Sequence, residues 1–374
     1  MEQDVTSRGQ FRMSPPAGKI RIGVVGCGAV AQIQHLPNLT FLSDAFDIVA
    51  VCDVSATLAR GAAEEYGIGA WHTDLDAFLT EPLDAVLLCH SDPKVEAAMC
   101  VLASGRHLFI EKPVAFVPED VDRMAAAAQS AGLVAQAGYM KVYDPAFLRV
   151  EAEVAAMRHD LRFVQINHLH TDNRHHLAHF RLRRADDLPA SAAEDLAARR
   201  HADARRALGD VPEHARSAFF HLAGSMIHDL YGLRQLLGPP DHVASTELWN
   251  GGLGITTVLA WEDGPRCAAT WVELERIRHF QETLEIYSGD RGVTLSYPTG
   301  FSRGQLSTVM VRGIDGEGQS FELCPAVDWE NPFVAQLRHF HACITQGLAC
   351  RTPLTAARHD VQLVVDITRA GLPT

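Results

Sequence analysis

The sequence predicts an α/β protein with two domains. The first is a doubly wound parallel sheet, and the second is an α+β domain with an open, mainly antiparallel sheet. The chain has 374 residues, of which 47% are hydrophobic, and this length favours two cores over one. Apolar runs alternate with helical segments up to about residue 140, and segments of alternating polarity separated by turns dominate afterwards.

Five apolar runs in the first part of the chain predict strands that are covered on both faces. They comprise residues 20–25, 47–52, 84–89, 106–110 and 133–137. Helical segments lie between them, at 30–42, 55–66, 93–104 and 118–131. Strands and helices that alternate in this way predict parallel pairing. We place this domain at residues 19–140, after a tail at residues 1–18 that we expect to be disordered.

The second predicted domain covers residues 141–374. Helices are expected at 145–158 and 218–237, a strand at 162–170, and an exposed, charged helical insertion at 181–216. Segments of alternating polarity then predict an antiparallel sheet with one covered face, at 242–249, 254–261, 266–274, 281–287, 292–297 and 306–312. Two closing helices are expected at 332–347 and 356–370, and their packing back on the first domain is compatible with the pattern.

Charge and composition exclude several classes of partner. The 46 acidic residues outnumber the 33 Lys and Arg, so we expect no binding to nucleic acid or to a membrane surface. No stretch approaches the ~20 apolar residues of a membrane span, and the N-terminus lacks the apolar core of a secretory signal. The 8 cysteines contain no CxxC pair, which indicates a reducing, cytoplasmic location.

The segment GCGAVA, from Gly26 to Ala31, follows the first strand directly and opens the first helix. In a dinucleotide-binding turn, Gly26 would permit the tight turn and Gly28 would let the backbone approach a pyrophosphate. Ala29 and Val30 begin the helix, whose free N–H groups attract phosphate, and Ala31 is the small residue that close packing requires. We therefore predict a Rossmann domain that binds a dinucleotide; the alternative is a merely tight turn.

Asp53 ends the second strand and is followed by Val54. A carboxylate at this place accepts hydrogen bonds from the ribose 2′-hydroxyl and repels a 2′-phosphate, which favours NAD, with NADP as the alternative. A cap for the helix that begins near Ser55 is a second role, compatible with the first. The ends of the third and fourth strands complete the predicted cofactor site, with His90, Glu111, Lys112 and Pro113.

Lys112 lies at the carboxyl edge of the predicted sheet, where open α/β proteins bind ligands. A lysine there can hold a substrate hydroxyl and stabilise its oxygen as negative charge develops. From position alone, a solvated surface charge is the commoner reading of a lysine.

These motifs resemble the family of glucose–fructose oxidoreductase, inositol dehydrogenase and rhizopine-catabolism proteins (Gfo/Idh/MocA). The resemblance spans about residues 20–370, and it is carried by 26–31, Asp53, 103–114, 227–230, 329–333 and 351–353. It implies NAD(P)-linked oxidation or reduction of a sugar, sugar derivative or cyclitol, without a metal. It also implies that Lys112 touches the reacting hydroxyl, that His228 is the general acid/base, and that the chain forms a homodimer or homotetramer.

The sequence departs from the family pattern around the proposed base. Many members carry aspartates four residues before and three residues after this histidine, where the chain has Gly224 and Tyr231. Members often have Thr-Pro after the third strand and a histidine shortly afterwards, where the chain has His90-Ser91 and Val95. These departures leave the proton relay and the substrate open.

Histidines are concentrated near the predicted cleft. His221, Ser225 and His228 share one face of a predicted helix, and an imidazole of pKa ~6.5 can accept a hydroxyl proton. We expect His221 to contact substrate, with a structural histidine as the alternative. The segment His168–His179 would bind a metal, line the substrate cleft or have no role, and His170 is its predicted substrate contact.

Lys141 and Tyr143 lie in the segment that joins the two domains and are predicted substrate contacts. The alternative is a hinge, in which Asp144-Pro145 starts the next helix. The function predicted is an NAD(P)-dependent dehydrogenase or reductase acting on CH–OH groups. Two alternatives are an epimerase or glycoside-cleaving enzyme that recycles its cofactor through a transient keto sugar, and a non-catalytic dinucleotide-binding sensor.

Overall fold

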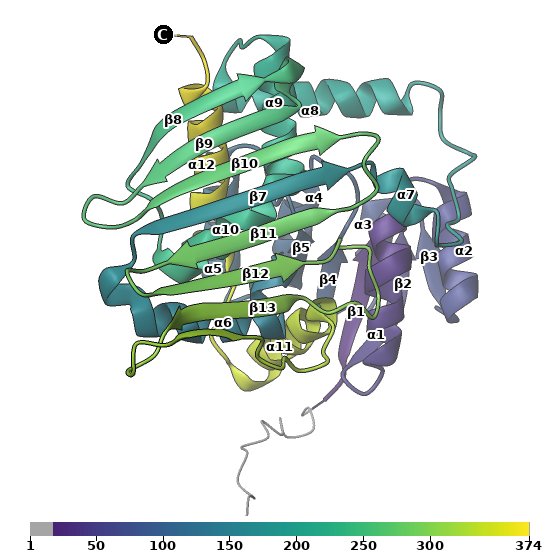
Figure 1. Cartoon of the computed structure of the whole chain (residues 1–374). Helices are drawn as coiled ribbons and strands as arrows, with labels where there is room; N and C mark the ends of the chain where they lie inside the picture. Colours follow the sequence, from purple (N-terminus) through teal and green to yellow (C-terminus); the bar gives the residue numbers. More distant parts are fainter. Residues whose placement is uncertain (1–17, 374) are drawn as a thin grey trace, which may run out of the picture.

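The computed structural model describes residues 18–373, which form two sheets with helices packed around them (Figure 1). The predicted disordered tail lies, apart from Gly18, outside these residues. Within the described part of the chain, no helix has the length and apolar character needed to cross a bilayer.

The first sheet is the predicted doubly wound parallel sheet, with the strand order β3-β2-β1-β4-β5-β6. Its strands are β1 (Ile20–Val25), β2 (Phe46–Cys52), β3 (Ala70–His72), β4 (Ala85–Leu88), β5 (His107–Glu111) and β6 (Ala135–Gly138), and every pair is parallel. The sequence analysis missed β3 because three residues carry too little periodic signal.

Helices cover both faces of this sheet, and alternate residues of one strand pack on opposite sides. In β4, Ala85 and Leu87 join the core under α1, α2 and α11, whereas Val86 and Leu88 join the core under α4 and α5. The bounds are η1 (Ala31–His35), α1 (Leu36–Phe41), α2 (Ala56–Tyr66), α3 (Leu75–Phe78), α4 (Val95–Ala103), α5 (Pro118–Ser130), α11 (Pro332–Gln346) and α12 (Leu354–Ala370). Of the two closing helices, α11 packs on the first sheet, whereas α12 lies between α5 of the first domain and the second sheet.

The second sheet has eight strands in the order β14-β13-β12-β11-β7-β10-β9-β8. All pairs are antiparallel except β7 with β10, so the expected mainly antiparallel sheet is confirmed. The strands are β7 (Phe163–Thr171), β8 (His242–Trp249), β9 (Gly254–Ala260), β10 (Arg266–Leu274), β11 (Gln281–Tyr287), β12 (Arg291–Tyr297), β13 (Thr308–Ile314) and β14 (Ser320–Leu323).

Helices pack on one face of the second sheet, behind the strands as drawn in Figure 1. They are α6 (Pro145–Met157), α9 (Glu213–His221) and α10 (Ile227–Leu237), with the short η2 (Met140–Tyr143), η3 (Arg158–Asp160) and η5 (Asn250–Gly252) at the connections. The single helix expected at 218–237 contains a π-helical turn, η4 (Leu222–Met226). Since π turns occur frequently at functional sites, this irregularity directs attention to the residues around it.

The expectation of a helical insertion at 181–216 is wrong for residues 181–191. These residues are not helical, and they cross to the first domain. There the Asp187 carboxylate accepts a hydrogen bond from the backbone N–H of Thr57, 3.0 Å away, at the start of α2. The helices of this region are α7 (Asn173–Leu177) and α8 (Ala192–Leu208). The charged run on α8 is only partly solvated, because Arg206 forms an ion pair with buried Asp120 at 2.8 Å.

Candidate active site

The glycine turn between β1 and η1 has the shape of a phosphate cradle. Gly26 has a φ of +96°, and a Cβ at this position would overlap the backbone of His90. Around Gly28 a Cβ would meet no atom within 4 Å, so the space in front of the helix start is open. Ala31 is buried where the helix packs on the sheet. These features fit the pyrophosphate of a dinucleotide, which needs a close backbone approach to free N–H groups.

Asp53 ties this turn to the end of β2. Its carboxylate accepts hydrogen bonds from the backbone N–H of Cys27 at 2.7 Å and of Ser55 at 2.9 Å. The neighbouring Val54 is 78% exposed. A second carboxylate, that of Asp187, lies beside the same stretch. It accepts hydrogen bonds from Ser55 Oγ and from the backbone N–H of Thr57. The ribose end of the cradle is therefore negatively charged.

His90, at the end of β4, fits the same cradle. Burial, followed by the nearby Lys94 ammonium, lowers the pKa of His90 to about 4, so the ring is neutral at pH 7. Its Nδ1 atom is buried, and no described residue bonds it. A bound ligand would supply the partner that buried polar atoms normally have.

Glu111 is held by the protein itself. Its carboxylate accepts the Lys112 backbone N–H at 3.1 Å and lies 2.8 Å from Nε2 of buried His35. The Lys112–Pro113 peptide bond is cis. Glu111 therefore positions the end of β5. Its carboxylate is already hydrogen-bonded within the protein, whereas a direct contact with the cofactor was expected.

A cavity of about 450 Å³ lies beside the glycine turn and is lined by both domains. Five predicted substrate or catalytic residues line it, namely Lys112, Lys141, His170, His221 and His228. Val30 of the turn lines it too. Tyr143 is the exception: it is 6% exposed, and its hydroxyl lies 2.9 Å from Thr352 Oγ1, away from the cavity. Its predicted role as a substrate contact is wrong, because η2 directs this ring into the core.

Lys112 reaches from the end of β5 to the π turn, where its Nζ donates a 2.6 Å hydrogen bond to the carbonyl oxygen of Gly224. Burial lowers the pKa of Lys112, while the Glu111 carboxylate opposes this effect. The ammonium has two further hydrogens, and the cavity lies in front of it. It can therefore bind a substrate oxygen and favour negative charge on it.

His228, on the first turn of α10, is fixed by Tyr231 one turn later. The Tyr231 hydroxyl lies 2.8 Å from His228 Nδ1 and accepts the backbone N–H of Lys141 at 3.2 Å. Burial, together with the positive charges of Lys112 and Lys141, holds the pKa of His228 well below its usual value. The ring is neutral at pH 7 and lines the cavity.

A buried charged cluster forms the floor of the cavity. His168 Nδ1 lies 2.7 Å from Asp229 Oδ2 and 3.9 Å from Glu282 Oε1, and the Lys141 ammonium bonds Glu282. Lys141 also lies over the Tyr297 ring, 4.5 Å from its centre. Burial and then the nearby Asp229 charge raise the pKa of Glu282 to about 7. His168, Asp229 and Glu282 have the chemistry of metal ligands, but Lys141 already supplies a cation among them.

Aromatic rings form one wall of the cavity. The His221 ring stacks on Trp271 with centres 4.5 Å apart, and His170 stacks on Trp271 at 5.6 Å. Burial lowers the pKa of both histidines, that of His170 to about 3, so both rings are neutral. Of the histidine-rich segment, His168 and His170 face the cavity, whereas His176 bonds Thr171.

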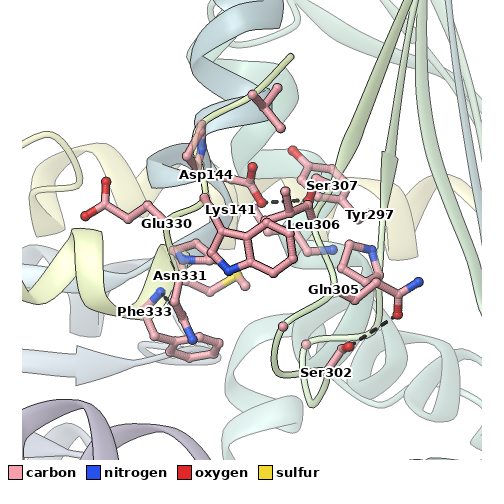
Figure 2. Close-up of a pocket in the computed structure, with 18 of the residues that line it drawn as sticks. Lys141, Asp144, Tyr297, Ser302, Gln305, Leu306, Ser307, Glu330, Asn331 and Phe333 are labelled. Atoms are coloured by element: carbon pink, nitrogen blue, oxygen red, sulfur yellow. Dashed lines mark hydrogen bonds between the residues drawn. The ribbon is translucent and has the colours of Figure 1, made fainter. Parts of the chain in front are cut away.

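A smaller pocket of about 70 Å³ adjoins the cavity (Figure 2), and the two share Met140, Lys141, Thr299, Gly300 and Phe333 in their lining. Asp144 accepts a 2.7 Å hydrogen bond from Ser307 here and also caps α6. The segment that joins the domains therefore has a structural role alongside its contribution to the cavity.

The sequence analysis missed Trp271, Glu282 and Asp187 as parts of the site. Glu282 carried a usable signal, because it occupies a position of β11 whose alternate neighbours, Leu284 and Ile286, are apolar and buried. A glutamate in such a series must be paired, and its partner comes from another part of the chain.

The first sheet and its glycine turn have the architecture of a dinucleotide-binding Rossmann domain. Residues 20–139 match the family described as "Oxidoreductase family, NAD-binding Rossmann fold" (Gfo/Idh/MocA). The chain is 31% identical over 136 residues to inositol 2-dehydrogenase of Klebsiella pneumoniae, and 31% identical over 137 residues to myo-inositol 2-dehydrogenase of Thermotoga maritima. These matches cover 35% and 36% of the chain, and the chain spans 40% of the length of either relative.

Solved structures share the whole fold at low sequence identity. UDP-N-acetylglucosamine 3-dehydrogenase of Acidithiobacillus ferrooxidans superposes with a TM-score of 0.69 at 17% identity, covering 95% of this chain and 98% of that one. Aldose-aldose oxidoreductase of Caulobacter crescentus superposes with a TM-score of 0.71 at 17% identity, with the same coverage. The sequence match to the Gfo/Idh/MocA oxidoreductase family lies in the first domain of the chain, at residues 20–139.

Proposed function

We propose that the protein is an NAD(P)-dependent dehydrogenase or reductase that acts on a CH–OH or keto carbon of a sugar, sugar derivative or cyclitol. One observation carries the proposal: Lys112 and His228 line the same cavity, directly beside the glycine turn. The relatives named above act, by their names, on inositol and sugar substrates, which supports this substrate class. The His221 ring, which stacks on buried Trp271, offers a flat wall for the apolar face of such a ring.

The chain's own residues would divide the work. Gly26 and Gly28 would hold the pyrophosphate of a dinucleotide, whose nicotinamide would supply the hydride chemistry. Lys112 binds the reacting oxygen and stabilises negative charge on it. His228 presents its Nε2 edge to the same cavity.

We propose NAD as the preferred cofactor. The carboxylates of Asp53 and Asp187 both lie at the ribose end of the cradle. A 2′-phosphate would meet two negative charges there, whereas a 2′-hydroxyl would find an acceptor. Relatives of this fold include a protein solved with NADP, so the discrimination belongs to these residues and not to the fold.

The test is absorbance at the reduced-nicotinamide band, with NAD⁺ or NADP⁺ and a panel of sugars, glycosides and cyclitols. Reduction of NAD⁺ by one substrate class supports the proposal. If no substrate or keto compound exchanges a hydride, and the purified protein carries no dinucleotide, the proposal fails. We further propose a cytoplasmic homodimer or homotetramer assembled through the open face of the second sheet; light scattering that finds a monomer would contradict it.

A further inference from the structure

The hydrogen bonding of His228 gives it the role of a donor. The Tyr231 hydroxyl already accepts the Lys141 N–H, and among the described residues His228 Nδ1 is the one hydrogen-bond partner left for its hydrogen. Buried hydroxyl groups use their hydrogen, so Nδ1 accepts it and the neutral ring carries its proton on Nε2. In this tautomer His228 donates to a substrate oxygen but has no lone pair with which to take a proton.

Ser225, three residues earlier, can pass a proton on, because its oxygen accepts one hydrogen bond and its hydrogen is available for another. The Trp271 indole N–H can only donate, and it donates to Ser225 Oγ at 2.9 Å. The Ser225 hydrogen is therefore free for another acceptor. His168 Nε2 lies 3.2 Å away and His170 Nδ1 lies 3.4 Å away.

His168 is the better acceptor of the two. Its Nδ1 bonds Asp229 at 2.7 Å, which leaves a lone pair on Nε2 and a carboxylate to stabilise a positive ring. The pKa of His170 falls to about 3 in its buried place, so that ring does not hold a proton at neutral pH. Ser225, His168 and Asp229 thus form one continuous chain that opens on the cavity at Ser225.

Titratable groups pack against His168 on several sides. They are Asp229 on α10, Glu282 on β11, Lys141 on η2 and the neutral His170 on its own strand. The Asp229 carboxylate bonds Nδ1, so a proton that reaches Nε2 places its positive charge beside a carboxylate.

We propose that Ser225, His168 and Asp229 are the proton relay of the oxidoreduction, with His228 as a hydrogen-bond donor to the reacting oxygen. In the oxidation, the hydroxyl proton of the substrate passes to Ser225 Oγ as the Ser225 proton passes to His168 Nε2. The C–H electron pair leaves as hydride to the bound dinucleotide, and the C=O bond forms. Reduction reverses each transfer. The inference rests on the proposed function, and it replaces the expectation that His228 is the base.

The kinetic test compares Ser225→Ala with Ser307→Ala, a serine outside the cavity that likewise bonds a carboxylate, that of Asp144. Loss of a proton-transfer group lowers turnover by about 10²–10⁴-fold. We expect this fall in kcat for Ser225→Ala, little change in the KM for NAD⁺, and partial rescue in Ser225→Thr. His168→Gln removes the acceptor of the Ser225 proton and should lower kcat to a similar extent. Full turnover in both variants would overturn the relay.

A second measurement does not depend on turnover. Long-range ¹H–¹⁵N NMR of the full-length protein reports which imidazole nitrogen carries the proton, and His168→Gln and His228→Gln assign the signals. We expect the proton on Nδ1 of His168 and on Nε2 of His228. The reverse tautomers would overturn the relay even in an active enzyme. The expected tautomers in a protein that moves no hydride would instead count against the proposed function alone.

Discussion

The ammonium of Lys112 donates a 2.6 Å hydrogen bond to the carbonyl oxygen of Gly224. This contact joins the carboxyl edge of the first sheet to the π turn in front of α10, so it links the cofactor domain to the helix that carries His228. Where the family often has an aspartate side chain, this chain offers a backbone carbonyl. The lysine is thereby oriented by a backbone carbonyl, without a carboxylate at position 224.

Lys112→Met should retain the fold and dinucleotide binding while kcat/KM for the alcohol substrate falls. Removing one donor that faces developing negative charge costs about 10²–10³-fold in rate. Steady-state kinetics and NAD⁺ titration by fluorescence measure the two effects. A Lys112→Met variant that is folded and fully active would contradict the assigned role. Lys94→Met, a buried lysine that bonds Asp92 and the Pro113 carbonyl, controls for the loss of a nearby cation.

Tyr231→Phe should change the equilibrium between the two tautomers of His228. The substitution removes the hydroxyl that lies at His228 Nδ1 and leaves the Lys141 N–H without an acceptor. An unsatisfied buried donor costs about 1–3 kcal/mol of stability. Without this hydroxyl the two tautomers of His228 become closer in free energy, so we expect kcat to fall by about tenfold, equivalent to about 1.4 kcal/mol. Thermal unfolding and kcat are the measurements.

The matched control is Tyr139→Phe, which changes the ring stacked on Tyr231 at 4.0 Å but leaves the His228 contact intact. Equal losses of kcat in the two phenylalanine variants would show that packing, and not the hydroxyl, sets the activity.

Much of the fold followed from the sequence because its signals are local. The runs that became β1 and β2 are continuous and apolar, and the turn at Gly26 lies between a strand and a helix. The cavity was less accessible. Lys112 and His228 were expected from motifs, whereas Glu282 and Trp271 reach the cavity only through the pairing of β11 and β10 with β7. Pairing between strands that are distant in the sequence cannot be recognised from the residue pattern of one strand.

The extended stretch with Asp187 was missed for a similar reason. Its composition is that of an exposed helix, and the competing contacts with Ser55 and Thr57 lie some 130 residues away in the chain. Tyr143 was misplaced because a residue of the joining segment can face either the cleft or the core, and only packing decides between them.

Asp53→Ser should weaken NAD⁺ and improve NADP⁺ as a cofactor. The carboxylate accepts two backbone N–H groups and is placed to accept the ribose hydroxyl. Hydrogen bonds to a charged group contribute about 1.5–3 kcal/mol, so the affinity for NAD⁺ should fall about 10- to 100-fold. Binding isotherms for both cofactors measure the change.

Asp187→Ser tests the second carboxylate. Its neighbouring control is Asp186→Ser, which removes the contact with Thr57 Oγ1. Unchanged selectivity in both Asp53→Ser and Asp187→Ser would refute the charge argument.

Glu282 should make the stability of the protein depend on pH. Burial and Asp229 raise its pKa from 4.5 to about 7, so the folded state holds this proton more tightly than the unfolded chain does. Its contribution to stability is therefore full below about pH 4.5 and is lost as pH rises to about 7. The loss amounts to at most about 3 kcal/mol. Glu282→Gln stays neutral and should lose less stability across this window. Urea unfolding of both proteins at pH 4.5, 6 and 7.5 measures the difference.

Glu285→Gln, on the opposite face of β11, controls for loss of a carboxylate. If the difference in stability between the wild type and Glu282→Gln stays constant across pH, Glu282 keeps its charge when folded.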